Sequence, residues 1–250
     1  MKICGKAPPR SRAGPAVVAA LAAFLLPSVG GAMTIDTFEA GQFSLTLSAP
    51  GTTSGTQGSS LTNVIGGERE VTLNWTGPTS GYIVGTDDAV ANVPSSPPIL
   101  SWNEDDGIYG WLKLVYDGTG STGLGGVDLT DAGTSPQMLV DFQMIDQDAD
   151  VKITLTDTAA TPVSHSVTKT VDVTGYTTNL IVAFELSDFA TAGVDTTKID
   201  KIEYLFTSTA AGDYQIRLLE SGIIPEPLTM LAVFTGVTGL AGYLRKRRSA

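Results

Sequence analysis

Residues 138–155, MLVDFQMIDQDADVKITL, contain two alternating runs on either side of an acidic stretch. In the first run, which starts at Met138, Val140, Phe142 and Met144 alternate with the polar residues Asp141 and Gln143. The second run repeats the pattern over 151–155. Alternation with a period of two residues is typical of strands that bury one face, and Asp-rich segments between such runs favour tight turns. We therefore predict an antiparallel hairpin, with strands ending at residue 145 and starting at residue 151.

The same period recurs along the chain between residues 33 and 222. Further runs at 43–47, 71–75, 111–116, 167–173, 202–206 and 214–218 alternate, and 181–184 is a short apolar run typical of a core strand. About ten short strands without helical periodicity predict an all-β fold, a two-sheet antiparallel β-sandwich of the jelly-roll type. The Gly/Ser/Thr-rich segment 49–60 is predicted to be a loop, as is 95–98.

Charge separates this middle segment from the two ends of the 250-residue chain. The whole chain has a net charge of −11, but residues 33–224 hold 7 basic and 25 acidic side chains, which makes −18. A domain without a basic stripe is not expected to bind nucleic acid. Cys4 and His165 are the only residues of their types, so an intrachain disulfide, a cysteine-based zinc site and a multi-histidine metal site are excluded.

The first 32 residues have the three parts of a secretory signal peptide. A basic segment precedes an uninterrupted apolar run at 16–26, and small residues follow, with Gly30 and Ala32 at the −3 and −1 positions for signal peptidase. We predict cleavage after Ala32 and export of the domain at 33–222. The alternative is an uncleaved membrane anchor.

The last 28 residues, 223–250, combine three features in a fixed order. Pro225, Glu226 and Pro227 come first, residues 228–244 carry no charge, and a basic cluster closes the chain. Seventeen residues form a helix of about 26 Å, near the minimum that spans a bilayer. The basic cluster that would keep this end in the cytoplasm is Arg245, Lys246, Arg247 and Arg248.

This ending resembles the PEP-CTERM sorting signal of exported bacterial proteins. The resemblance implies recognition by an exosortase, a membrane cysteine protease-transpeptidase, and a link to exopolysaccharide and biofilm. The exported domain would be anchored in the inner membrane first and reach the cell surface or the extracellular matrix later. The alternative is that the helix stays as a permanent anchor.

Five short motifs follow one another along the middle segment: Phe38-Glu39, Gly66-Gly67-Glu68-Arg69-Glu70, Tyr116-Asp117-Gly118, Phe184-Glu185-Leu186-Ser187-Asp188-Phe189 and Ile199-Asp200-Lys201-Ile202. In this order of motifs, residues 34–220 are similar, more loosely, to galactose-binding-domain-like jelly rolls, the shape of many carbohydrate-binding modules. This similarity implies glycan binding and a structural calcium, for which Asp36, Glu39 and Asp213 are the candidate ligands.

Aromatic residues gather around an acidic stretch at 103–107. Trp102, Tyr109 and Trp111 are candidates for stacking on sugar rings, and the alternative is that all three belong to the core. The acidic stretches at 103–107 and 146–150 predict turns first and cation sites second.

Three functions remain open on the sequence alone. The main prediction is a structural or interaction protein of the cell surface or matrix, and the alternative is a glycan-binding module. A secreted polysaccharide hydrolase ranks last, because no spacing singles out a pair of catalytic carboxylates and His165 lies in an alternating segment. We therefore do not expect an enzyme.

Overall fold

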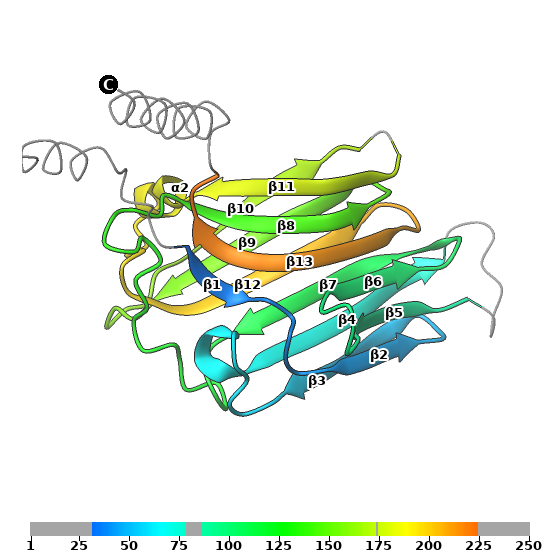
Figure 1. Cartoon of the computed structure of the whole chain (residues 1–250), viewed down its shortest axis with the longest axis horizontal. Coiled ribbons are helices and arrows are strands. Elements are labelled where there is room, and N and C mark those ends of the chain that lie inside the picture. Colours follow the sequence, from blue (N-terminus) through cyan, green and yellow to red (C-terminus); the bar gives the residue numbers. More distant parts are fainter. Residues whose placement is uncertain (1–31, 79–86, 174, 225–250) are drawn as a thin grey trace, which may run out of the picture. The chain divides into compact units, whose positions relative to one another are not determined.

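The two strands predicted within residues 138–155 exist, but they belong to two different antiparallel sheets and do not pair with each other, so the prediction of a hairpin is wrong (Figure 1). The computed structural model describes residues 32–78, 87–173 and 175–224. β8 ends at Ile145 as predicted, and β9 begins at Ala149, two residues earlier than predicted. These two strands enter different sheets, so the acidic turn crosses from one sheet to the other.

Sheet A has the strand order β11-β8-β13-β6-β5-β2. On the edge of β13 where β6 pairs with residues 213–216, β1 pairs with residues 219–221. Its strands are β1 (Met33–Asp36), β2 (Phe43–Leu47), β5 (Ala89–Val93), β6 (Leu100–Glu104), β8 (Gln137–Ile145), β11 (Thr177–Glu185) and β13 (Asp213–Gly222).

Sheet B has the order β10-β9-β12-β7-β4-β3, and every pairing is antiparallel. Its strands are β3 (Gly51–Gln57), β4 (Arg69–Pro78), β7 (Ile108–Tyr116), β9 (Ala149–Asp157), β10 (Ser164–Val171) and β12 (Ile199–Ser208). A 3₁₀ turn, η1 (Ile65–Gly67), precedes β4, and the short helix α2 (Leu186–Thr191) follows β11.

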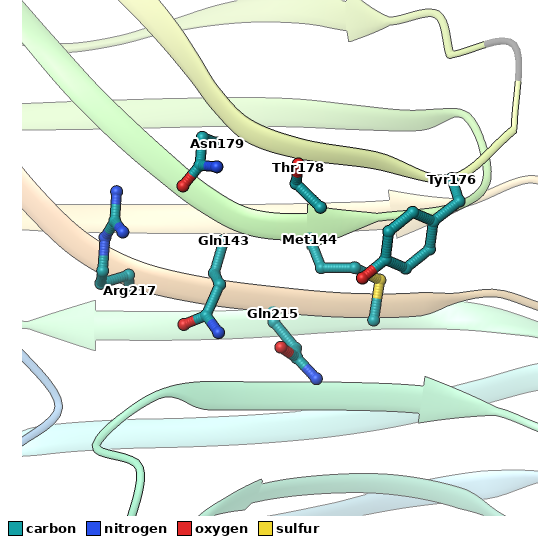
Figure 2. A pocket seen from close by; sticks show the side chains of 7 residues that line it. All are labelled: Gln143, Met144, Tyr176, Thr178, Asn179, Gln215 and Arg217. Atoms are coloured by element: carbon teal, nitrogen blue, oxygen red, sulfur yellow. The ribbon is translucent and has the colours of Figure 1, made fainter.

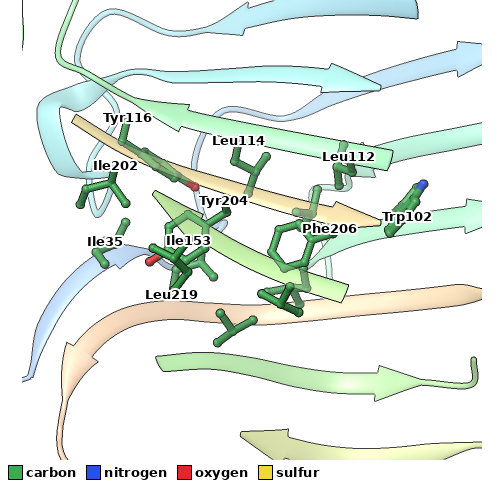
Figure 3. Packing of buried hydrophobic residues seen from close by; sticks show 14 of the residues in the cluster. Ile35, Trp102, Leu112, Leu114, Tyr116, Ile153, Ile202, Tyr204, Phe206 and Leu219 are labelled. Atoms are coloured by element: carbon green, nitrogen blue, oxygen red, sulfur yellow. The ribbon is translucent and has the colours of Figure 1, made fainter. Parts of the chain in front are cut away.

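The alternating apolar side chains of both sheets form one core. Tyr204 and Phe206 on β12 stack, and Tyr116 meets Tyr204 edge to face (Figure 3). Phe206 also meets Phe142 of sheet A edge to face. These side chains have almost no exposed surface, as the period of two predicts. The prediction of a two-sheet antiparallel sandwich is confirmed.

A buried ion pair fixes the first strand to sheet B. Arg69 donates to both carboxylate oxygens of Asp36, over 2.5 and 2.8 Å, and the Tyr116 hydroxyl donates to Asp36 over 2.7 Å. Neither member of the ion pair is exposed, and the guanidinium lies 5.0 Å from the ring centre of Phe38. Because each buried charge has a partner, the network holds β1, β4 and β7 together.

One segment differs from the prediction. Residues 51–57, expected in a loop, form strand β3, which pairs residue by residue with β4 from Gly51 opposite Trp75 to Gln57 opposite Arg69. Thr and Ser suit an exposed edge strand, and pairing with β4 supplies the stabilisation that this segment's few apolar atoms do not.

The predicted signal peptide, apart from Ala32, and the predicted sorting signal from Pro225 onward lie outside the described residues. Within the described ranges, no helix has the length and apolar character needed to cross a bilayer.

Candidate functional site

A groove of about 370 Å³ lies on the outer face of sheet A, over β8, β11 and β13 (Figure 2). The side chains that point inward from the same strands, such as Phe142 and Ile216, belong to the core. The groove is lined by Gln143, Met144, Tyr176, Thr178, Asn179, Gln215 and Arg217.

Irregular pairing creates this hollow. The ladder between β8 and β13 shifts register between Gln215 and Leu218, beside Gln143 and Arg217. On β11, Asn179 has a φ of 55°, in the left-handed region that asparagine tolerates. Bulges of this kind bend a strand and re-aim its side chains. Gln143 and Met144 therefore both line the groove, and Ile145 takes the inward position.

The groove holds little net charge although the domain is strongly acidic. Arg217 is its only charged lining residue, and its Nη2 and Nε lie 2.7 and 3.0 Å from the same carboxylate oxygen of Asp141. Asp141 is mostly buried, whereas about half of the Arg217 side chain is exposed. Burial, together with Asp141, raises the pKa of the nearby Glu220 carboxyl. The charge of the Arg217 guanidinium is therefore balanced by Asp141, and the exposed half of the side chain can still donate hydrogen bonds.

The lining groups match a ligand rich in hydroxyls. Gln143, Asn179 and Gln215 each offer an amide that both donates and accepts hydrogen bonds, and Thr178 adds a hydroxyl. Tyr176 is 73% exposed, which is the largest exposure of any bulky apolar side chain in the described residues. Tyr176 lies at one end of the groove and Arg217 at the other, with the two glutamines between them (Figure 2). An exposed ring next to amides can stack on the C–H face of a sugar while the amides bind its hydroxyls.

The predicted aromatic platform does not exist as one site. Trp102 is 1% exposed and stacks on Tyr214 in the core, with ring centres 4.6 Å apart, so its prediction as a ligand-binding residue is wrong. Tyr109 and Trp111 lie on β7 and point to the outer face of sheet B, half-buried. Trp111 stands opposite Asn74 on one side and Thr207 on the other.

The predicted calcium ligands are also separated. Asp36 is buried and occupied by Arg69, and Glu39 accepts a hydrogen bond from Asn63. Asp36 pairs with Leu219, six residues along β13 from Asp213, which corresponds to about 20 Å. In the part of the chain that the structure describes, no group of three or more acidic, histidine or cysteine side chains is arranged to hold a metal ion.

The two acidic stretches form turns, as predicted, but each turn connects one sheet to the other and does not close a hairpin. Residues 105–107 connect β6 to β7, with Gly107 at a φ of 82°. In the turn at 146–148, Asp146 accepts the backbone N–H of Asp213, and Asp148 accepts that of Val173. These carboxylates therefore hold neighbouring loops together.

The groove residues were missed at the sequence level. Gln143 and Gln215 look like ordinary outward-facing positions of alternating strands. Tyr176 and Asn179 both lie before the apolar run at 181–184, which signals only a core strand. A weak sign was the adjacent pair Met144-Ile145, which breaks the alternation at the bulge.

Comparisons with known proteins found no matching family model and no matching curated protein. Several solved structures show a distant similarity to this chain. A family 11 carbohydrate-binding module from Clostridium thermocellum, in complex with a β-1,3-1,4-mixed-linked tetrasaccharide, has 12% identity and a TM-score of 0.38, covering 78% of this chain and 97% of that one. A variant of a family 29 carbohydrate-binding module has 12% identity and a TM-score of 0.30, covering 63% and 99%. The protein PfGH50B has 12% identity and a TM-score of 0.36, covering 54% of this chain and 22% of that one.

Proposed function

We propose that this protein binds a segment of a polysaccharide in the groove outside sheet A. The observation that carries the proposal is the combination of an exposed tyrosine, three amides and an ion-paired arginine in one groove. Side-chain amides can donate hydrogen bonds to sugar hydroxyls and accept hydrogen bonds from them. An exposed aromatic ring can pack against the apolar C–H face of a sugar ring.

The size of the groove fits an oligosaccharide rather than a single sugar. Strand β8 gives the distance between the two ends of the groove. Tyr176 directly precedes Thr177, which pairs with Ile145 of β8, whereas Arg217 lies opposite residues 141–142 of β8. Four to five residue steps separate these levels, roughly 15 Å along the strands. A chain of several sugars in this direction would contact the tyrosine at one end and the guanidinium at the other.

The same lining favours binding without hydrolysis. Glycoside hydrolysis uses two carboxyl groups that flank the bond to be broken. No carboxylate is among the residues that line this groove, and the neighbouring Asp141 is engaged by Arg217. We infer a non-catalytic binding protein.

Tyr109 and Trp111 form a second candidate platform, on the outer face of sheet B. They are two residues apart on one strand, so both rings lie on the same face about 7 Å apart. Unlike Tyr176 they are half-buried, and neither of them lines the groove on sheet A.

We further propose that the domain acts outside the cytoplasm. The support is the sequence of the two ends: the signal-peptide pattern of residues 1–32, and Pro225, Glu226 and Pro227 followed by an apolar segment and a basic cluster. Signal peptidase and an exosortase would process the chain, and a glycan binder delivered in this way would associate with exopolysaccharide. Mass spectrometry of the protein from its host tests this step, because an intact carboxyl terminus on all of the protein would contradict processing.

The binding site is tested with the full chain on a glycan array, followed by calorimetry with the best ligand. We expect Tyr176→Ala to weaken binding roughly tenfold, equivalent to about 1.4 kcal/mol for the lost stacking. Gln143→Ala should weaken it as well. Tyr109→Ala is the matched control on the opposite sheet and should bind like the wild type.

Two outcomes would contradict the assignment. Loss of binding in Tyr109→Ala or Trp111→Ala, with Tyr176→Ala unaffected, would move the site to sheet B. No binding to any glycan by the folded wild-type chain would remove the proposed function.

A further inference from the structure

One side of the sandwich carries almost no charge. Residues 40–67, 71–86 and 89–103 contain no Asp, Glu, Lys or Arg, although the domain as a whole has a charge of −18. These ranges include β2, β3 and β5 and most of β4, which lie side by side (Figure 1). Nineteen of the 25 acidic residues of the domain come at or after Glu104. Two copies of this molecule therefore repel each other least when they approach through the β2–β5 side.

The same side presents an unprotected strand edge. β3 is the last strand of sheet B and pairs only with β4, in regular register over seven residues. The backbone groups on its other edge have no backbone partner within the described residues. The strand consists of Gly, Thr, Ser and Gln, with most side chains exposed. It lacks the lysine, proline and bulge with which proteins usually block an edge.

The opposite side of the sandwich does have such protection. The edge strand β10 carries Lys169, whose ammonium lies 5.5 Å from the ring centre of Phe184, and helix α2 packs against β10 and β11. The edge strand β11 contains Asn179 in a left-handed conformation, which interrupts a regular edge. The difference between the two sides makes the open edge of β3 a specific feature and not a general property of the sandwich.

We propose that β3 pairs with β3 of a second copy of this chain. Pairing of a strand with itself around a two-fold axis is antiparallel and uses the same surface on both partners. An axis at Ser54, the middle of the strand, would place Ser54 opposite its counterpart and Thr52 opposite Thr56. The two B sheets would join into one continuous sheet, and the glycan-binding groove on each A sheet would stay accessible.

Disulfide trapping tests this pairing in the full chain with Cys4 replaced by serine. Directly opposite residues in an antiparallel pair have Cα atoms about 4.5–5.5 Å apart, within the range that a disulfide spans. Under mild oxidation, Ser54→Cys should form a covalent dimer roughly tenfold faster than Thr168→Cys, because the pairing raises the effective concentration of the thiols. Thr168 is the matched control, an exposed hydroxyl residue on the edge strand β10 of the same sheet.

The oligomeric state of lysine variants at the same two positions, measured by analytical ultracentrifugation, provides an independent test. Ser54→Lys would place like charges opposite each other and should convert the dimer to monomer, whereas Thr168→Lys should leave the dimer intact. A wild-type chain that is monomeric at roughly 100 µM would overturn the proposal. A dimer that survives Ser54→Lys, or equal cross-linking at both positions, would also overturn it.

Discussion

Glu104 is a buried carboxyl group at the end of β6, with its side chain turned into the sandwich. It is 5% exposed, and neither carboxylate oxygen has a hydrogen-bond partner among the described residues. Burial raises the pKa of Glu104 to about 8. The pKa of the Tyr214 hydroxyl is also raised, mainly by its own burial and next by the nearby Glu104. At neutral pH the folded protein therefore holds most of this group in its neutral form.

This group predicts a pH dependence of stability. Its pKa is higher in the folded chain than the unfolded value of 4.5, so the folded state retains the proton between pH 4.5 and about 8. Its contribution is fully present below pH 4.5 and is lost as the pH rises towards 8. Compared with Glu104→Gln, the wild type should lose on the order of 3–5 kcal/mol over this range.

Chemical denaturation of both proteins at a series of pH values measures this difference. The two free energies of unfolding should change in parallel below pH 4.5 and diverge above it. Parallel curves from pH 4 to pH 9 would show that Glu104 titrates normally and that solvent reaches it.

At the scale of elements, two glycines in sheet B have different roles. A Cβ atom on Gly55 of β3 would meet its nearest atoms at 3.4 Å or more, whereas one on Gly110 of β7 would lie 2.0 Å from the backbone oxygen of Asn74. Gly110 also exchanges hydrogen bonds with the Ser208 hydroxyl across the pair of strands. Gly110 is needed for close approach of the backbones, and Gly55 is not.

We expect Gly55→Ala to stabilise the protein by about 0.5 kcal/mol, because the unfolded chain loses freedom and the strand gains no clash. Gly110→Ala should destabilise it by 2 kcal/mol or more, on the order expected for forced movement of a packed strand. Urea unfolding at one pH compares the two substitutions. Equal effects would mean that β7 can move away from β4 without cost.

Strands with large alternating side chains could be predicted from the sequence, and those without could not. β8 and β9 were evident because Phe142, Ile153 and similar residues mark one buried face. The sequence predicts a loop at β3 because Gly51–Gln57 contains no large apolar side chain, whereas the strand conformation comes from pairing with β4. The groove could not be predicted for a related reason: it depends on a register shift between β8 and β13, which are distant in sequence. Trp102 was misplaced because a core aromatic and a binding aromatic look the same in an alternating pattern.

At the scale of the whole molecule, the domain has many more carboxylates than cations to pair them. Ion pairs in the described part of the chain include Asp36–Arg69, Asp141–Arg217, Asp195–Lys198 and Glu203–Lys201. Most of the other acidic side chains face water at the loops and on the outer faces of the sheets, where their mutual repulsion destabilises the folded state.

Salt should therefore stabilise the protein at neutral pH. Raising the ionic strength from about 0.02 M to about 0.5 M shortens the Debye length several-fold, and we expect the melting temperature to rise by roughly 3–5 °C. Calorimetry at pH 7 and at about pH 4, where many carboxyls are protonated, separates this effect from general salting-out. A rise of equal size at both pH values would contradict repulsion as its cause.

The pairing of β1 with β13 has a consequence for how the chain reaches its native state. The first strand of the domain hydrogen-bonds to the last, from Met33 opposite Ser221 to Asp36 opposite Leu219. In a polypeptide that emerges amino terminus first, the strand that β1 pairs with in sheet A follows only almost 190 residues later. Contacts so distant in sequence slow folding. Sheet A of the nascent domain therefore stays incomplete until the last strand, β13, has been synthesised.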